Sequence, residues 1–423
     1  MKLIMVLYEL KKVLNKRTSQ ILLVFMVLCV VWSCRSAIYS VEWINADGSI
    51  EVGRGAAKKL QTAQQEWAGT LDESMLRKAL DEVKRLDAMP EALSKNFMEN
   101  RIAQSWQQGI QEIRTLLNLS FAEGFQNYND RIAGMVSSEA LPDFYPNRIN
   151  TLKDWLYGKD EENLYVESLY SETEKQFLIN RYSALGTPFI IEYSQGWVQV
   201  MRYASTVLQL GMILLGLLLA GIFSDEFQWK TDTVYFSSVH GRGKGTTAKL
   251  ITGFLLITVV FLLSMGTYSL IVLGSLGFGG GSCPIQVQMR YWKSMYNLTF
   301  RQAYILILCM GYAGELFFGF LVMLISSKMR SPHLAVMIPP LAILLPNFLK
   351  VILQNIDSAF VGKLLGLLPN QMLNGTMVLS MLDVYSFGNK VLTPISLMLP
   401  LYTLFFLLLA YLCYREAKRK QIT

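Results

Sequence analysis

Residues with the chemistry of a functional site are concentrated between positions 222 and 250 of this 423-residue sequence. The run GRGKGTT at 241–247 has the composition of a phosphate-binding loop. A P-loop, however, places Ser or Thr directly after Gly-Lys and a further glycine five positions before that glycine. Here Gly245 follows Lys244, and position 238 is serine. The sequence therefore predicts no nucleotide-binding loop of its own, and any ATP would be hydrolysed by a separate subunit.

The same segment holds an ordered set of polar residues between two apolar runs. The set consists of Asp225, Glu226, Thr231, Ser238, Arg242 and Lys249. No arrangement typical of an enzyme accompanies it, such as a Ser-His-Asp set or a His-Glu-x-x-His motif. The only histidines are His240 and His333, and no Cys-x-x-Cys occurs, so we predict no metal site. We expect a protein that is not an enzyme and that holds no cofactor.

One further residue, Glu315, stands inside the long apolar run 302–327. An unpaired charge at this depth in a membrane would cost several kcal/mol. Two interpretations stay open. The carboxyl group could line a translocation path, or it could form a hydrogen bond between helices, which the small neighbours Gly311 and Gly314 would favour by allowing close approach.

The elements that must position these residues are long and apolar. Hydrophobic residues make up 52% of the chain and charged residues 17%, below the roughly 25% of soluble domains. A helix needs about 20 apolar residues to cross a bilayer. Six runs meet this requirement: 18–41, 203–224, 250–278, 302–327, 331–349 and 391–414. The expected fold class is an all-α polytopic membrane protein with six transmembrane helices.

The net charge of +7 is unevenly distributed, since residues 42–199 sum to −8 and the remainder to +15. The excess Lys and Arg residues lie beside the apolar runs. This is the pattern of the positive-inside rule rather than of nucleic-acid binding. We therefore expect a multi-pass protein of the cell (plasma) membrane, surrounded by the lipid bilayer, with both termini and the loop 225–249 in the cytoplasm.

The other segments have their own patterns. Residues 1–17 carry apolar residues at helical spacing, which predicts a cytoplasmic interfacial amphipathic helix. Residues 42–199 would form an extracellular, mostly helical domain, long enough for its own core, with amphipathic stretches at 71–86 and 102–117. Thr70 and Glu73 have the spacing of a helix capping box. Within the membrane domain 200–423, residues 355–390 are apolar but broken by Gly and Pro, which predicts an outer re-entrant or interfacial segment.

The loop 225–249 resembles the loop between the second and third spans of type-2 ABC exporter permeases. In that family an acidic residue is followed by Gly-Thr, then by Ser-Pro-x-x-Arg, and then by a Lys that opens the next span. Matching positions are held here by Glu226, Thr231, Ser238, Arg242 and Lys249. Lys230 and Val239 replace the usual Gly and Pro.

The resemblance implies the membrane-spanning permease subunit of an ABC transporter, which exports an amphipathic compound or peptide. It implies two partners, an ABC ATPase subunit that docks on the loop 225–249 and a second permease subunit. The polar set of the loop would then couple ATP hydrolysis to the membrane helices. The alternative is a membrane-anchored sensor or immunity protein whose extracellular domain binds a ligand without transport.

Overall fold

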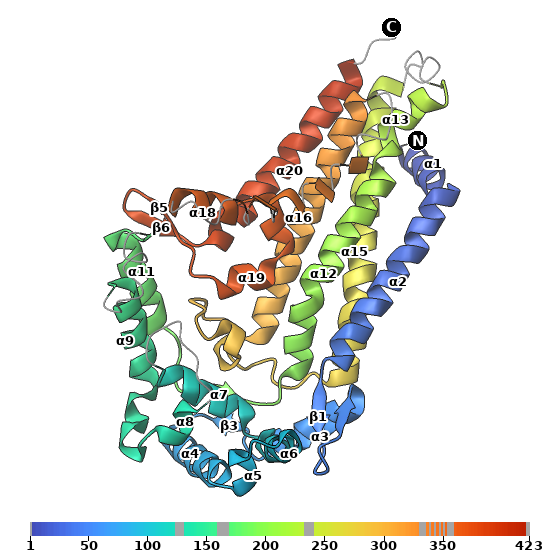
Figure 1. The fold of residues 1–423 in the computed structure, drawn as a ribbon. Helices are drawn as coiled ribbons and strands as arrows, with labels where there is room; N and C mark the ends of the chain where they lie inside the picture. The colour runs from blue at the N-terminus through green and yellow to red at the C-terminus, as the bar shows by residue number, and fades with distance from the viewer. Residues whose placement is uncertain are drawn as a thin grey trace.

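The computed structural model is predominantly helical, with three two-stranded sheets among the residues it describes (Figure 1). The described residues are 2–122, 131–158, 169–231, 241–329, 336–337, 340–341, 344–346, 348–349, 352 and 359–419. The long helices stand side by side as a bundle, and a group of shorter helices covers one of its ends. Both termini lie at the other end of the bundle.

Five helices in the described part of the chain are long and apolar enough to cross a membrane. The chain is therefore a multi-pass membrane protein. The five are α2 (Arg17–Tyr39), α12 (Gln195–Leu219) continued by α13 (Gly221–Gln228), α15 (Thr246–Leu276), α16 (Phe300–Lys328) and α20 (Pro394–Arg419). They correspond to five of the six expected spans. Most of the remaining run, 331–349, lies outside the described residues.

Glycines allow the bundle helices to approach closely. A Cβ atom on Gly253 of α15 would lie 2.3 Å from the sulfur of Met323 on α16. One on Gly311 of α16 would lie 2.6 Å from a methyl carbon of Leu208 on α12. Small residues of this kind let helix backbones pack tightly where no hydrophobic effect drives association. Within the bundle α12 is largely buried, while the apolar side chains of α20 mostly face outward.

The amino terminus forms the expected amphipathic helix, α1 (Lys2–Leu14). Its inner side buries Val6, Glu9 and Val13 against the bundle, whereas Leu3 and Ile4 are exposed. The exposed apolar side is the one that an interfacial helix would turn toward lipid. Glu9 points inward, so α1 brings a carboxylate to the bundle.

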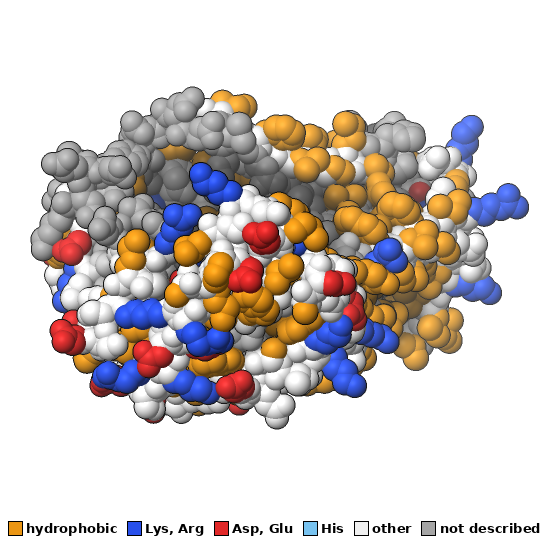
Figure 2. Space-filling model, turned by 60° about the horizontal axis from the view of Figure 1, so that its bottom comes forward, with side chains coloured by type: hydrophobic (Ala, Val, Ile, Leu, Met, Phe, Trp, Pro, Cys, Tyr) orange, Lys and Arg blue, Asp and Glu red, His pale blue; other side chains and the backbone are white. Residues whose placement is uncertain are grey.

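Residues 42–194, here called the polar domain, follow α2 and consist mainly of short helices. These are α3 (Arg54–Gln65), α4 (Glu73–Asp87), α5 (Pro90–Leu93), α6 (Phe97–Gln107), α7 (Gln111–Ser120), α8 (Ile132–Met135), η1 (Ser138–Asp143), α9 (Phe144–Leu156) and α11 (Glu172–Ser183). The strands β1 (Glu42–Ile44) and β2 (Ile50–Val52) form one antiparallel hairpin, and β3 (Gly69–Thr70) pairs with β4 (Ile190–Ile191). In Figure 2 this domain faces the viewer with mixed charged and apolar side chains, and apolar side chains cover much of the visible bundle beside it.

One local expectation for this domain, the capping box of Thr70 and Glu73, was wrong. The N-cap of α4 is Asp72, whose side chain accepts a hydrogen bond from the Met75 amide, and not Thr70. Thr70 is unavailable because it belongs to β3 and pairs with Ile190. The amphipathic stretch 102–117 is divided between α6 and α7 near Gly109. A Cβ atom there would lie 2.8 Å from the carbonyl oxygen of Ala63 in α3, so the close approach of α3 requires glycine.

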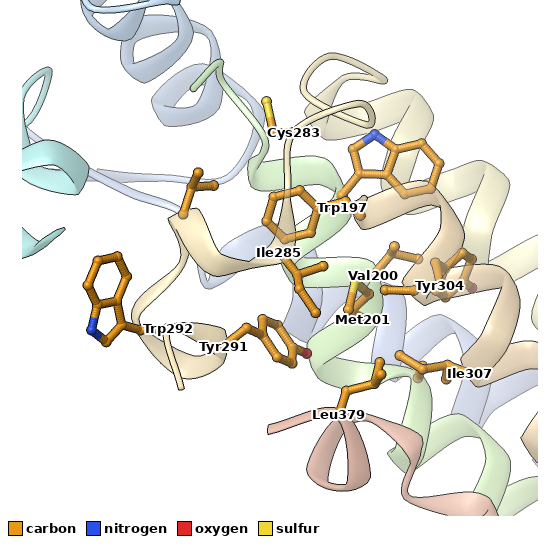
Figure 3. Packing of buried hydrophobic residues seen from close by; sticks show 14 of the residues in the cluster. Trp197, Val200, Met201, Cys283, Ile285, Tyr291, Trp292, Tyr304, Ile307 and Leu379 are labelled. Atoms are coloured by element: carbon orange, nitrogen blue, oxygen red, sulfur yellow. The ribbon is translucent and has the colours of Figure 1, made fainter. Parts of the chain in front are cut away.

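One hydrophobic cluster is continuous from the polar domain into the bundle. The joining element is the loop between α15 and α16, which includes η4 (Ile285–Val287) and η5 (Met289–Tyr291). Its residues Ile285 and Trp292 pack in one cluster with Trp197 of α12 (Figure 3). The Trp292 ring also lies 6.1 Å from that of Phe144 in α9. The polar domain is therefore packed directly against the membrane-spanning helices through this loop.

The segment after residue 358 contains only short elements among its described residues. They are α18 (Ala359–Gly366), η6 (Pro369–Leu373), α19 (Gly375–Ser380) and the hairpin of β5 (Tyr385–Phe387) with β6 (Lys390–Leu392). None of them is long enough to cross a bilayer. Lys363 of α18 forms an ion pair of 2.7 Å with Glu174 of α11, which ties this segment to the polar domain.

Candidate functional site

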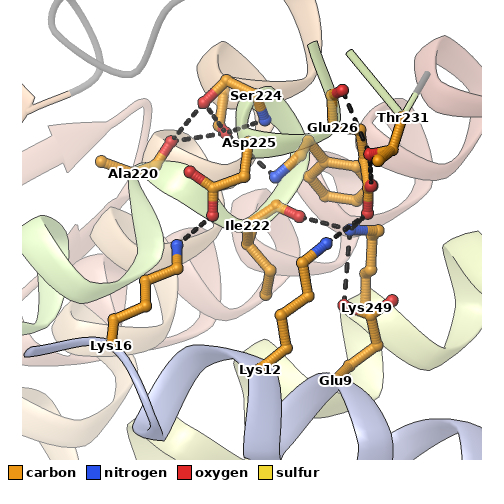
Figure 4. A network of polar contacts seen from close by, with 12 residues as sticks. Glu9, Lys12, Lys16, Ala220, Ile222, Ser224, Asp225, Glu226, Thr231 and Lys249 are labelled. Atoms are coloured by element: carbon orange, nitrogen blue, oxygen red, sulfur yellow. Dashed lines mark hydrogen bonds and ion pairs between the residues drawn. The ribbon is translucent and has the colours of Figure 1, made fainter. Parts of the chain in front are cut away.

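A buried polar network joins α1, α13 and α15 at the end of the bundle that carries both termini (Figure 4). At its centre is Lys249, in the first turn of α15, whose side chain is fully buried. Its Nζ atom donates to the carbonyl oxygen of Ile222 at 2.6 Å and to Oε1 of Glu226 at 2.8 Å. Oε2 of Glu9 lies 3.4 Å from the same atom. A buried ammonium group is strongly destabilising unless it is paired, and these three oxygens compensate for its lost hydration.

Both carboxylate oxygens of Glu226 are occupied. Oε1 accepts from Lys12 of α1 at 2.5 Å as well as from Lys249, and Oε2 accepts from the hydroxyl group of Thr231 at 2.8 Å. Glu226 is itself nearly buried. Charge-assisted bonds of this kind are about twice as strong as neutral ones. Glu226 therefore links the preceding helix, the amino-terminal helix and the beginning of the following span.

The end of α13 has the hydrogen-bond pattern of a Schellman motif. The Lys230 amide donates to the carbonyl of Phe227, and the Thr231 amide donates to that of Glu226 at 2.9 Å. Lys230 has a φ angle of 55°, in the left-handed region that favours glycine. Lys230 stands at the position where type-2 ABC exporter permeases, which the loop resembles, usually have glycine. The backbone thus adopts the glycine conformation although a lysine is present.

A second contact with the amino terminus lies beside the first. Asp225 pairs with Lys16, which immediately precedes α2. The ammonium groups of Lys12 and Lys16 lie 5.0 Å and 5.2 Å from the centre of the Trp229 ring. Cations at such distances are attracted by the ring face. Asp225 and Trp229, just after the second expected span, are therefore held by Lys12 and Lys16 from the amino-terminal segment.

The bend between α12 and α13 is attached to α16 by serine hydroxyl groups. Ser326 donates to the carbonyl of Ala220 at 2.6 Å and accepts from the amides of Phe223 and Ser224 at 3.3 Å. The Ser224 hydroxyl group donates to the same carbonyl at 3.0 Å. These bonds satisfy backbone groups that a bend leaves open. The network consequently reaches a fourth helix.

The structure brings together four of the six residues expected in the coupling set: Asp225, Glu226, Thr231 and Lys249. Ser238 lies outside the described residues. Arg242 belongs to the π-helical turn η3 (Gly241–Gly245), and its side chain lies outside the described part. Sequence reasoning had not assigned Glu9, Lys12 and Lys16 to this site. The spacing of three residues between Glu9 and Lys12 was the available signal, since it places them on one side of the amphipathic helix, whereas Lys16 lies beyond the end of that helix.

Glu315 lies apart from this network, within α16. It is almost completely buried, and its Oε2 atom has no hydrogen-bond partner among the described residues. A Cβ atom on Gly211 of α12 would lie 3.4 Å from Oε1, so α12 passes close to the carboxyl group. The structure therefore provides close helix packing at Glu315 but no hydrogen bond between helices at Oε2 in the described residues.

Comparison with known proteins identifies no relative of this chain. A scan against models of protein families finds no match to this chain, and a search of curated proteins finds no similar sequence.

Proposed function

We propose that this chain is the membrane-spanning permease subunit of an ABC transporter and that it exports an amphipathic compound or peptide. A separate ATPase subunit docks on the loop 225–249 from the cytoplasm, and a second permease subunit completes the assembly. The observation that carries this proposal is the buried pair of Glu226 and Lys249, which holds the start of the loop against the first turn of the next span.

A coupling element has to transmit force from the ATPase to the membrane helices. An ATPase that closes on nucleotide can move membrane helices only through an element that does not yield. Here α13 is attached to α15 through Lys249, to α1 through Lys12 and to α16 through Ser326. A displacement of the loop would therefore reach several helices together, which suits a coupling element.

The charge distribution supports the proposed orientation. The basic residues Lys11, Lys12 and Lys16 lie at one terminus, and Arg415, Lys418 and Arg419 lie at the other, at the same end of the bundle. The positive-inside rule assigns this end of the bundle to the cytoplasmic side of the cell membrane. The polar domain then lies outside the cell.

The positive φ angle of Lys230 also supports the family resemblance. Glycine adopts the left-handed conformation without a steric penalty. If the same turn ends the helix in the family, this explains why the family has glycine at this position. The chain departs from the family in residue type at this position while its backbone follows the turn that a glycine would favour.

The proposal is tested by co-expressing the chain with an ABC ATPase encoded beside it and by purifying both in lipid. We expect the ATPase to co-purify, and its rate of ATP hydrolysis to rise when the chain is present. Glu226→Gln should reduce this stimulation, because the loop loses its charged anchor. Glu91→Gln, a matched change in the polar domain, should leave it unchanged.

A chain that neither binds nor stimulates the ATPase, while remaining folded, would contradict the proposal and favour the membrane-anchored sensor or immunity protein. Equal stimulation by wild type and Glu226→Gln would remove the coupling role of the network while leaving the permease itself in place.

A further inference from the structure

Three tryptophans from different elements line one groove on the surface of the polar domain. Trp43 belongs to β1, Trp67 follows α3, and Trp106 lies on α6. The groove has a volume of about 500 Å³, and α4 forms its opposite wall. Pockets in this range bind drug-sized ligands. We propose that this groove binds an organic cation that carries an apolar group, an activity that goes beyond the transport proposal and does not depend on it.

A cation of the protein itself already occupies the aromatic surface. The ammonium group of Lys78 lies 4.4 Å from the centre of the Trp67 ring. Its ion pair with Glu66 is long, at 3.4 Å, and both side chains are more than half exposed. Exposed pairs of this kind contribute little. Lys78 can therefore swing into water and leave the indole face and the Glu66 carboxylate to the positive group of a ligand, which is the interaction that aromatic cages use.

The other charges of the groove favour a cation over an anion. Arg85 is held by Glu82 through two bonds of 2.6 Å and 2.7 Å, so its guanidinium group is already neutralised. Asp81 also lines the groove, and the structure shows no ion pair for it among the described residues. Once Lys78 has moved away, the groove keeps the carboxylates of Glu66, Asp81 and Glu82 and the paired guanidinium group of Arg85. The resulting negative potential attracts positive ligands.

The apolar part of the ligand would contact Trp43 and Trp106. The Trp106 side chain is 40% exposed, and Trp43 is half-buried. Their relative position is fixed, because the Gln108 side chain accepts from the amide of Ile44 at 2.7 Å and donates to its carbonyl oxygen at 2.8 Å. A rigid aromatic surface reduces the entropy lost on binding. Since Trp43 follows shortly after the end of α2, the ligand would also bind close to the first span.

The test uses the full chain in lipid nanodiscs and isothermal titration calorimetry. The probe is benzyltrimethylammonium, and benzenesulfonate is the comparison, because it has a similar ring with the opposite charge. We expect saturable binding of the cation and no binding of the anion. Trp67→Ala should weaken cation binding by roughly tenfold, as the loss of a desolvated cation–π contact predicts. Phe97→Ala removes an exposed ring of α6 outside the groove and should leave binding unchanged.

Lys78→Gln gives the most specific outcome. Removing the competing ammonium group should tighten cation binding by roughly threefold to tenfold, since the indole face no longer has to be vacated. This exposed substitution leaves the core intact, so it decides the matter even if Trp67→Ala fails to fold. Absence of saturable cation binding, equal binding of the anion, or unchanged or weakened binding by Lys78→Gln would overturn the proposal.

Discussion

The Nζ atom of Lys249 lies 2.8 Å from Oε1 of Glu226, and the lysine side chain is fully buried. Removing one member of a buried pair leaves an uncompensated charge and costs about 3–5 kcal/mol. We therefore expect Glu226→Gln to lower the free energy of unfolding by an amount in this range, because Lys249 would lose its nearest carboxylate while the Glu9 carboxylate lies 3.4 Å away. Denaturant unfolding in detergent measures the change.

The double variant Glu226→Leu/Lys249→Met is the control for this prediction. It replaces both charges of the central pair with apolar groups and should recover part of the lost stability, because the Lys249 ammonium group is no longer buried without its partner. Glu9 and Lys12 each lose one partner in this variant, but their charges are opposite and both remain on α1. A loss of less than 1 kcal/mol in Glu226→Gln would show that the pair is not buried in the membrane-embedded protein.

Lys230→Gly should stabilise the protein. Lys230 occupies the left-handed region at the end of α13, where a residue with a side chain is strained by about 1–2 kcal/mol and glycine is not. We expect a gain of about 1 kcal/mol in the free energy of unfolding, measured as above. Lys11→Gly, an exposed position inside α1, is the matched control and should lose about 1 kcal/mol, since glycine is unfavourable within a helix. Equal losses for both variants would contradict the αL assignment.

Glu112 should make the stability of the protein depend on pH. Burial at the junction between α7 and α12 raises the pKa of Glu112 to about 7, and hydrogen bonds from Gln288 at 2.9 Å and Gln195 at 3.3 Å only partly oppose this effect. The folded protein binds this proton more tightly than the unfolded chain. The free energy of unfolding is therefore highest below pH 4.5 for this group and falls as the pH rises to about 7, by at most about 3 kcal/mol.

Thermal unfolding between pH 4.5 and pH 8 measures this dependence. Glu112→Gln cannot ionise, so the fall attributable to this position should disappear in that variant while the remaining pH dependence is retained. Identical pH profiles for wild type and variant would show that the carboxyl group is solvated in the folded state.

Glu315→Leu should raise the free energy of unfolding by about 1–3 kcal/mol. Oε2 of Glu315 is buried without a partner among the described residues, and an unsatisfied buried polar group is destabilising by this amount.

The same variant, Glu315→Leu, should abolish export if the carboxyl group lines the translocation path, as measured with the ATPase complex in liposomes. Glu315→Gln keeps the shape and separates charge from polarity: normal transport in this variant would remove the charged role. A destabilised Glu315→Leu protein would indicate a structural hydrogen bond instead.

The membrane-spanning elements were predictable from sequence alone. Each of the five long helices overlaps an apolar run of about 20 residues or more, because the thickness of the bilayer sets the length and water exclusion sets the composition. The amphipathic helix before the first span was also predictable, since periodicity of apolar residues is a local property. The resemblance of the loop 225–249 had singled out Glu226 and Lys249, and the structure places these two side chains in contact.

Only the tertiary structure decided which charges meet. Glu9 and Lys249 are 240 positions apart in the sequence, and no local pattern indicates that α1 packs against the start of α15. The N-cap of α4 moved to Asp72 because Thr70 pairs with a strand 120 positions away. The three tryptophans of the groove come from segments with no common periodicity. Composition and period determine which segments enter the membrane, whereas ion pairs, caps and binding surfaces between distant segments depend on packing in three dimensions.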